Sequence, residues 1–144
     1  MDQQKPALAW HSLEFSSQAH PEGAKRVRFF EHEGARILHV DFSKADLPLI
    51  REIASECLRA NMNQPPTSVL SLVEVQGIPF DTDALKVGQE LTDLCQKYAR
   101  RTAVSGVTGF RSFLLEAIAK ASNRPIRLFK DREKALEWLL KDET

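Results

Sequence analysis

The segment 101–140 constrains the fold more than any other part of the chain. It reads as a strand, a glycine-framed turn, a helix, a second strand and a final capped helix, with no residue to spare. We predict strands at 102–107 and 126–129, a helix at 110–121 and a last helix that Asp131 caps. Because a strand, a crossover and another strand follow one another, the two strands are expected to be parallel.

The preceding residues extend this pattern. Two apolar runs flank Glu33-Gly34 and predict a β-hairpin. Asp46 is expected to cap a helix with apolar residues at three-and-four spacing, residues 68–75 form a strand rich in Leu and Val, and a second helix begins after residue 80. The predicted order is ββαβαβαβα. The fold class is α/β, with a mixed, mainly parallel sheet of four or five strands covered by helices.

The length of 144 residues fits one domain. Residues 1–24 are predicted to be a weakly ordered N-terminal arm, and 25–142 the domain. Twenty basic residues balance twenty acidic ones, so net charge gives no reason to expect nucleic acid as a partner. No apolar run approaches the roughly 20 residues of a transmembrane segment, and no hydrophobic leader is visible, so we expect a cytoplasmic location.

The residues with reactive side chains form no recognisable catalytic or metal-binding set. Cys57 and Cys95 lie in separate apolar helical patterns, which predicts buried, reduced thiols. The four histidines lack metal-ligand spacing. His39, Asp41 and Ser43 are too close along one strand to form a catalytic triad. We therefore expect a protein without metal, cofactor or enzymatic activity.

Three motifs carry a family resemblance. V-L-S-L-V-E-V-Q-G-I-P-F-D from Val69, A-V-S-G-V-T-G-F from Ala103 and L-F-K-D-R-E-K-A-L-E-W-L from Leu128 resemble the SpoIIAA-like family of STAS-type domains. The resemblance covers about residues 27–140. It implies a sheet covered by helices, related in fold to STAS and CRAL-TRIO lipid-binding proteins. It implies little about activity, because the family is mostly uncharacterised.

The same resemblance points to a candidate phosphoacceptor. Anti-sigma factor antagonists of the STAS type have Asp-Ser at a helix start, and phosphorylation of this serine switches off partner binding. Here the stretch reads Phe80-Asp81-Thr82, and Asp83 follows. A phosphate on Thr82 is stabilised by the helix N-terminus but repelled by the two aspartates. Thr82 is thus either a phosphoacceptor or an ordinary residue of the helix cap.

A glycine-containing turn after the strand at 102–107 is a candidate anion site. Its backbone N–H groups and an arginine are placed to hold a phosphate or carboxylate. The residues are Ser105, Gly106, Thr108, Gly109 and Arg111. The turn lacks the Lys-Ser/Thr ending of a P-loop, and the alternative is a tight structural turn.

These observations leave competing functions. The leading hypothesis is a non-catalytic STAS-like regulatory module that binds another protein, and self-association through an exposed sheet edge is compatible with it. The alternative is a carrier or sensor of a lipid or other hydrophobic small molecule. The apolar residues Phe110, Phe113, Leu114, Leu115 and Ile118 favour this alternative, although such residues equally fill a core. An enzyme is the third hypothesis.

Overall fold

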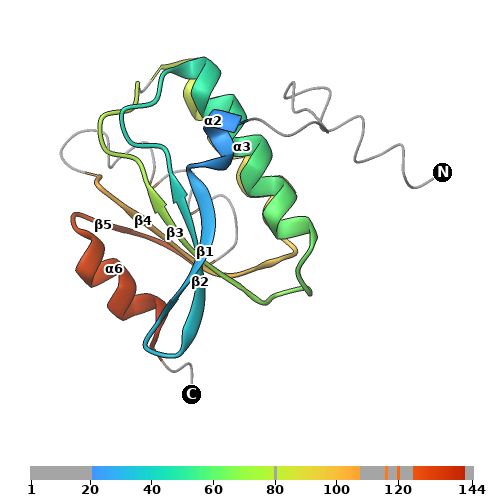
Figure 1. Ribbon diagram of the computed structural model, residues 1–144. Helices are drawn as coiled ribbons and strands as arrows, with labels where there is room; N and C mark the ends of the chain where they lie inside the picture. Colours follow the sequence, from blue (N-terminus) through green and yellow to red (C-terminus); the bar gives the residue numbers. More distant parts are fainter. Residues whose placement is uncertain (1–20, 80, 108–115, 117–119, 121–124, 142–144) are drawn as a thin grey trace.

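The computed structural model describes residues 21–79, 81–107, 116, 120 and 125–141 (Figure 1). Its helices are α2 (Pro21–Ala24), α3 (Leu47–Met62), α4 (Thr82–Cys95) and α6 (Arg132–Leu139). Its strands are β1 (Val27–His32), β2 (Ala35–Asp41), β3 (Val69–Glu74), β4 (Ala99–Ser105) and β5 (Ile126–Phe129). They form one sheet in the order β1-β2-β3-β4-β5, in which β1 is antiparallel to β2 and the other neighbours are parallel. The predicted α/β fold with a mixed, mainly parallel sheet is confirmed.

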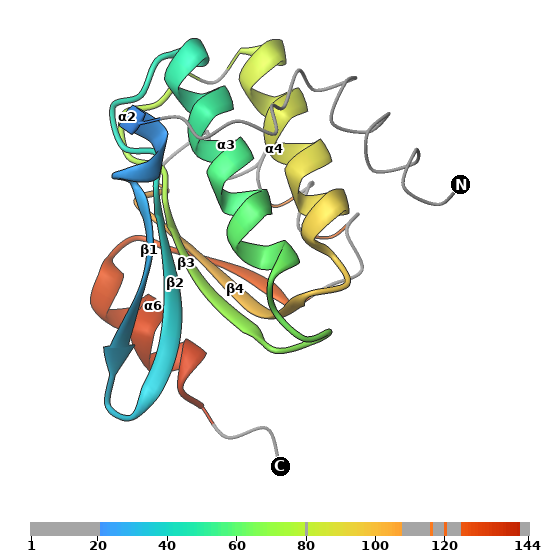
Figure 2. The same ribbon diagram turned by 45° about the vertical axis from the view of Figure 1, so that its right-hand side comes forward.

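The sheet separates two helical layers. Helices α3 and α4 lie side by side on one face, and α6 covers the other (Figure 2). Consecutive strand residues point to opposite faces, so Leu38 packs in the core beneath α3 while Ile37 packs in the core beneath α6. Along β3, Leu70 and Leu72 likewise face α6, and the strand is buried on both sides as predicted.

The hairpin turn between β1 and β2 has left-handed backbone at both central residues. Glu33 has φ 51° and Gly34 has φ 83°. Two positive φ values match the twist of the flanking strands, which is why a glycine is favoured here. The predicted hairpin is confirmed.

Aspartate caps begin the three longer helices. Asp46, Asp81 and Asp131 each accept a hydrogen bond from the backbone N–H three residues later, at 3.1, 2.9 and 2.9 Å. The cap satisfies an N–H group that has no partner within the helix. All three helix starts agree with the prediction.

Strand β4 begins and ends earlier than the predicted 102–107. Pairing with β3 starts where Ala99 lies opposite Val69. Arg101 is accommodated within the strand because its guanidinium lies over the Trp138 ring, 5.2 Å from the centroid, and donates to the Trp138 carbonyl oxygen at 2.6 Å. The strand stops at Gly106, whose φ of +89° breaks the extended backbone. The predicted bounds were therefore wrong by three residues at the start and two at the end.

The predicted N-terminal arm overlaps the described residues at Pro21–Ala24. These four residues form α2, which packs on α3 so closely that a Cβ at Gly23 would lie 2.8 Å from the Glu52 carbonyl carbon. Residues 1–20 lie outside the described part of the chain.

The predicted third helix falls almost entirely outside the described residues. Glu116 and Lys120 are helical and exposed. The apolar residues proposed to favour a carrier, Phe110, Phe113, Leu114, Leu115 and Ile118, lie outside the described residues.

Candidate functional site

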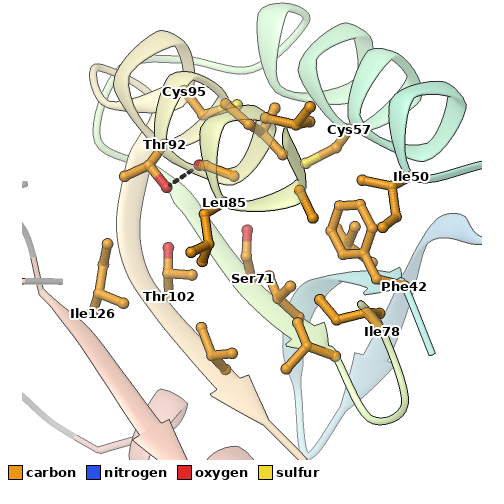
Figure 3. Close-up of a pocket in the computed structure, with 18 of the residues that line it drawn as sticks. Phe42, Ile50, Cys57, Ser71, Ile78, Leu85, Thr92, Cys95, Thr102 and Ile126 are labelled. Carbon is orange, nitrogen blue, oxygen red and sulfur yellow. Dashed lines mark hydrogen bonds between the residues drawn. The ribbon is translucent and has the colours of Figure 1, made fainter. Parts of the chain in front are cut away.

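An apolar cavity of about 160 Å³ lies between α4 and the sheet (Figure 3). Its size is close to that of a protein cavity that holds one benzene molecule, and it is smaller than a typical pocket for a drug-sized ligand. Helices α3 and α4 and strands β2 to β5 all contribute to it. Lining residues include Phe42, Ile50, Cys57, Ser71, Val73, Ala84, Leu85, Gly88, Leu91, Thr102, Val104, Ile126 and Leu128.

The small residues of α4 explain why space remains here. Ala84 and Gly88 are one helical turn apart and both line the cavity. A Cβ added at Gly88 would meet no other atom within 4 Å. Beneath them, Val104 of β4 and Leu128 of β5 stay only half-buried. The helix thus lacks the side-chain volume to close over these two strands.

Five polar side chains interrupt the mostly apolar lining: Asn61, Ser71, Thr92, Gln96 and Thr102. Two of them, Ser71 and Thr102, lie on the strands of the sheet. Ser71 of β3 and Thr102 of β4 are direct neighbours in the sheet, and Ser71 is 6% exposed. Their hydroxyl oxygens both point toward α4 (Figure 3). Among the described lining residues there is no Asp, Glu, Lys, Arg or His. The cavity is therefore suited to a neutral molecule.

Both cysteines line the cavity. The sequence places them 38 positions apart, but packing of α3 on α4 brings Cys57 and Cys95 into contact. Both thiols are free. The pKa of the Cys95 thiol is raised well above its ordinary value, chiefly by the hydrogen bond with Cys57 and then by burial. Cys57 is buried as predicted, whereas Cys95 is half-buried. The two thiols are in contact although they lie far apart in the sequence.

A second, polar pocket of about 340 Å³ lies at the carboxyl ends of β2 to β5, beside the start of α6. Open α/β sheets commonly bind ligands at this edge. Its charged residues are Asp41, Glu74 and Asp131, which are acidic, and Lys130 and Arg132, which are basic. The two pockets lie on opposite faces, because Ser71 and Val73 of β3 line the apolar cavity and Glu74 lines the polar pocket.

The predicted anion-binding turn is only partly described. Ser105, 1% exposed, and Gly106 both line the polar pocket. Thr108, Gly109 and Arg111 lie outside the described residues. The structure thus brings Ser105 and Gly106 together with Lys130 and Arg132, whereas the arginine predicted to hold the anion is not described.

Close backbone contacts hold the loops of this edge together. A Cβ at Gly106 would lie 3.1 Å from the Gln76 backbone nitrogen. A Cβ at Gly77 would lie 3.2 Å from Lys44 Cγ, and the Lys44 N–H donates to the Gln76 carbonyl oxygen at 2.8 Å. Gly77 and Gly106 have φ of +78° and +89°, and Lys44 has φ of +58°. The glycines are needed both for close approach and for backbone conformation.

The Asp41 carboxylate of the polar pocket has partners in Ser43 and Arg26. It accepts hydrogen bonds from the Ser43 backbone N–H at 2.9 Å and the Ser43 hydroxyl at 2.6 Å, and Arg26 Nη1 lies 3.9 Å from Asp41 Oδ2. Burial acts to raise the pKa of Asp41, but the Ser43 hydrogen bonds and then Arg26 lower it below its ordinary value. Asp41 is therefore ionised at neutral pH.

His39 and Ser43 have different carboxylate partners. His39 Nε2 is hydrogen-bonded to Glu74 Oε2, and Arg132 Nη1 lies 3.8 Å from the same oxygen. The Phe30 ring packs edge-on against His39, with centroids 6.1 Å apart. Ser43, by contrast, donates to Asp41. The nucleophile and base of a triad must be hydrogen-bonded to each other, and these two residues are not so paired.

Thr82, the candidate phosphoacceptor, is the first residue of α4 and is exposed. The preceding Asp81 is the N-cap and accepts from the Ala84 N–H at 2.9 Å. Thr82 is thus accessible at a helix N-terminus, but the capping function belongs to Asp81 and not to Thr82.

Sequence reasoning missed the residues that complete both pockets. Lys130 and Arg132 were assigned only to the start of a helix, and Glu74 only to a strand. A usable signal existed for the polar pocket, since polar residues that follow parallel strands meet at one edge of the sheet. No comparable sequence signal marked Ser71 and Thr102 as cavity residues. Each lies in a strand, and only the tertiary structure shows which residues of α4 face that strand.

The described residues form neither a membrane-spanning helix nor a cluster of metal ligands. Among the described helices, none combines the length and apolar character needed to cross a bilayer. The described residues also contain no group of three or more His, Cys, Asp or Glu side chains placed to hold a metal ion. Comparisons with known protein families, with curated proteins and with solved structures found no match.

Proposed function

We propose that the chain is a non-catalytic carrier or sensor domain that binds a compact hydrophobic molecule in the cavity between α4 and the sheet. The observation that carries this proposal is the cavity itself, which is apolar, has no charged side chain in its described lining and holds about 160 Å³. Transfer of apolar surface from water into such a space is favourable in proportion to its area. The resemblance to CRAL-TRIO lipid-binding proteins supports the proposal, although the cavity suits a ring-sized molecule better than a long lipid chain.

A titration of the full chain with toluene, followed by amide NMR, tests this function. We expect shifts at Gly88, Val104 and Leu128, with no change at Gly34 in the distant hairpin. A dissociation constant on the order of 1 mM is expected, because a ligand of this size offers few contacts to offset the entropy lost on binding.

A pair of leucine variants distinguishes the cavity from the surface of α4. Gly88 is exposed and also lines the cavity, so Gly88→Leu places a side chain at the cavity's rim and should abolish toluene binding. Gln89→Leu adds the same side chain at the next, exposed position and should leave binding intact. If toluene moves no cavity amide, or binds Gly88→Leu as well as the unchanged protein, the proposed function is wrong.

The exposed position of Thr82 supports a second candidate, a STAS-like regulatory module that binds another protein. A phosphate on Thr82 would lie beside the free N–H groups at the start of α4, which favour negative charge, while Asp81 and Asp83 oppose it. Such a modification would change the charge of the helix end and thereby control partner binding. A cytoplasmic location and self-association stay predictions from the sequence.

Phosphopeptide mapping of the protein from its own cells tests this second candidate. Phosphate is expected on Thr82 and not on Thr92, whose hydroxyl already donates to the Gly88 carbonyl oxygen at 2.8 Å. Thr82 that is unmodified under every growth condition would remove the switch.

A further inference from the structure

We infer that the ligand of the apolar cavity is neutral and carries one hydrogen-bonding group, such as a hydroxyl or carbonyl, that binds to the Ser71 and Thr102 hydroxyls. This inference rests on the proposed function and names the chemical class of its ligand. Ser71 and Thr102 are then specificity-determining residues.

The placement of the two hydroxyls supports one shared contact point. Ser71 and Thr102 are opposite each other on the parallel strands β3 and β4, and both side chains point toward α4 (Figure 3). Each hydroxyl can donate one hydrogen bond and accept others, so together they can bind either an alcohol or a carbonyl group. The remaining cavity wall is dominated by apolar side chains, which leaves the rest of the ligand in a hydrophobic environment.

The absence of charge from the described lining disfavours an ionised ligand. A carboxylate in the cavity would lose its hydration without gaining a cationic partner, which is strongly unfavourable. The cations Lys130 and Arg132 line the polar pocket on the opposite face of the sheet. Fatty acids and other anions are thus poor candidates, whereas alcohols, phenols, ketones and similar neutral molecules fit.

Three probes of related shape separate these classes. Toluene is apolar, phenol has nearly the same size with one hydroxyl, and benzoate is anionic at pH 7. The decisive quantity is the ratio of phenol affinity to toluene affinity, since the ratio isolates the hydroxyl from the contacts of the shared ring. In the double variant Ser71→Ala/Thr102→Val this ratio should fall about tenfold, the effect of one lost hydrogen bond, while toluene affinity is retained. Benzoate should bind at least about 100-fold more weakly than phenol.

Two controls protect this test. Thr92→Val removes a cavity hydroxyl that is already bonded within α4, and it should leave the ratio unchanged. Ser71→Ala alone should lower the ratio as well, which provides a second variant should Thr102→Val disturb the strand.

The outcomes separate the inference from the proposed function. If toluene binds but the ratio is unchanged in the Ser71 and Thr102 variants, or if benzoate binds as tightly as phenol, the inference is wrong and the hydrophobic carrier stands. If no probe binds, the carrier itself is wrong and the inference falls with it.

Discussion

The two faces of the sheet differ in how completely the described helices cover them. On one face α3 and α4 bury the strands near β2 but leave an apolar cavity over β4 and β5. On the other, the eight residues of α6 suffice to bury Leu72 and Ala103 completely. The short helix α6 covers this face because large side chains pack beside it. The Arg101 and Arg127 guanidinium groups both lie over the Trp138 ring, 5.2 and 5.7 Å from its centroid.

The same contrast appears in charge. The cavity beneath α4 has no charged side chain in its described lining, whereas the pocket beside α6 has five. The charged lining and the uncharged described lining thus lie on different faces of one sheet. Helix length alone is therefore a poor guide to closure, since the bulk and chemistry of the facing side chains decide what space remains.

The largest expected effect compares leucines on the two faces. Leu72→Ala removes a fully buried side chain beneath α6 and should lower the free energy of unfolding by about 3 kcal/mol. Leu85→Ala, in the half-buried cavity wall, should cost about 1 kcal/mol, because space already adjoins it. Urea denaturation measures both. Equal losses would mean that the cavity wall is as tightly packed as the opposite core.

Glycines at the two pockets should respond in opposite directions. Gly106→Ala should destabilise the protein by about 2 kcal/mol, because φ is +89° and the added Cβ would meet the Gln76 backbone at 3.1 Å. Gly88→Ala should stabilise it by about 1 kcal/mol, because the residue is helical and its surroundings are open. Thermal unfolding of both variants checks the signs, and a loss at Gly88 would contradict the open cavity.

The ion-pair network of the polar pocket should contribute a smaller amount. Glu74→Gln leaves His39 and Arg132 without their carboxylate and should cost about 1 kcal/mol. Glu133→Gln, an exposed change in the first turn of α6, is the matched control and should have little effect. An indistinguishable stability of the two variants in urea would show that the network is not structural.

The smallest effect concerns the cysteine pair and pH. Because the folded pKa of Cys95 is raised, the unfolded chain releases the thiol proton first as pH increases past about 8.5. Stability contributed by this group is present below that pH and falls above it, by less than about 1.4 kcal/mol per pH unit. Denaturation of the unchanged protein and Cys95→Ala at pH 7 and 9.5 should show a steeper loss in the former. Parallel losses would exclude Cys95 as the cause.

Local sequence signals predicted most of the fold. The aspartate caps, the Glu33-Gly34 turn and the apolar periodicity each depend on residues close together in the chain, and all agree with the structure. The start of β4 was missed because Arg101 is stabilised by Trp138, which is 37 positions away. A contact of this kind overrides local propensity and has no local signature.

The candidate sites were much less predictable. The sequence singled out Ser105 and Gly106, which line the polar pocket, but Glu74 and Arg132 come to the same pocket from other elements. The apolar cavity arises because Gly88 gives α4 no side chain at this position. Whether a missing side chain leaves a cavity depends on the residues that face it in the fold. The contact of Cys57 with Cys95 likewise follows from packing of α3 against α4, which their spacing did not indicate.

The uninterrupted strand order has a consequence for biosynthesis. Each strand pairs with the one made just before it, so the sheet can grow at one edge as the ribosome delivers the chain. Among the described elements, α6 departs from this pattern, since it packs on strands completed earlier. Until α6 is synthesised, it cannot bury Ile37, Leu72 and Ala103. The nascent domain therefore exposes an apolar surface until α6 emerges from the ribosome. A chaperone would bind this surface most readily during that interval.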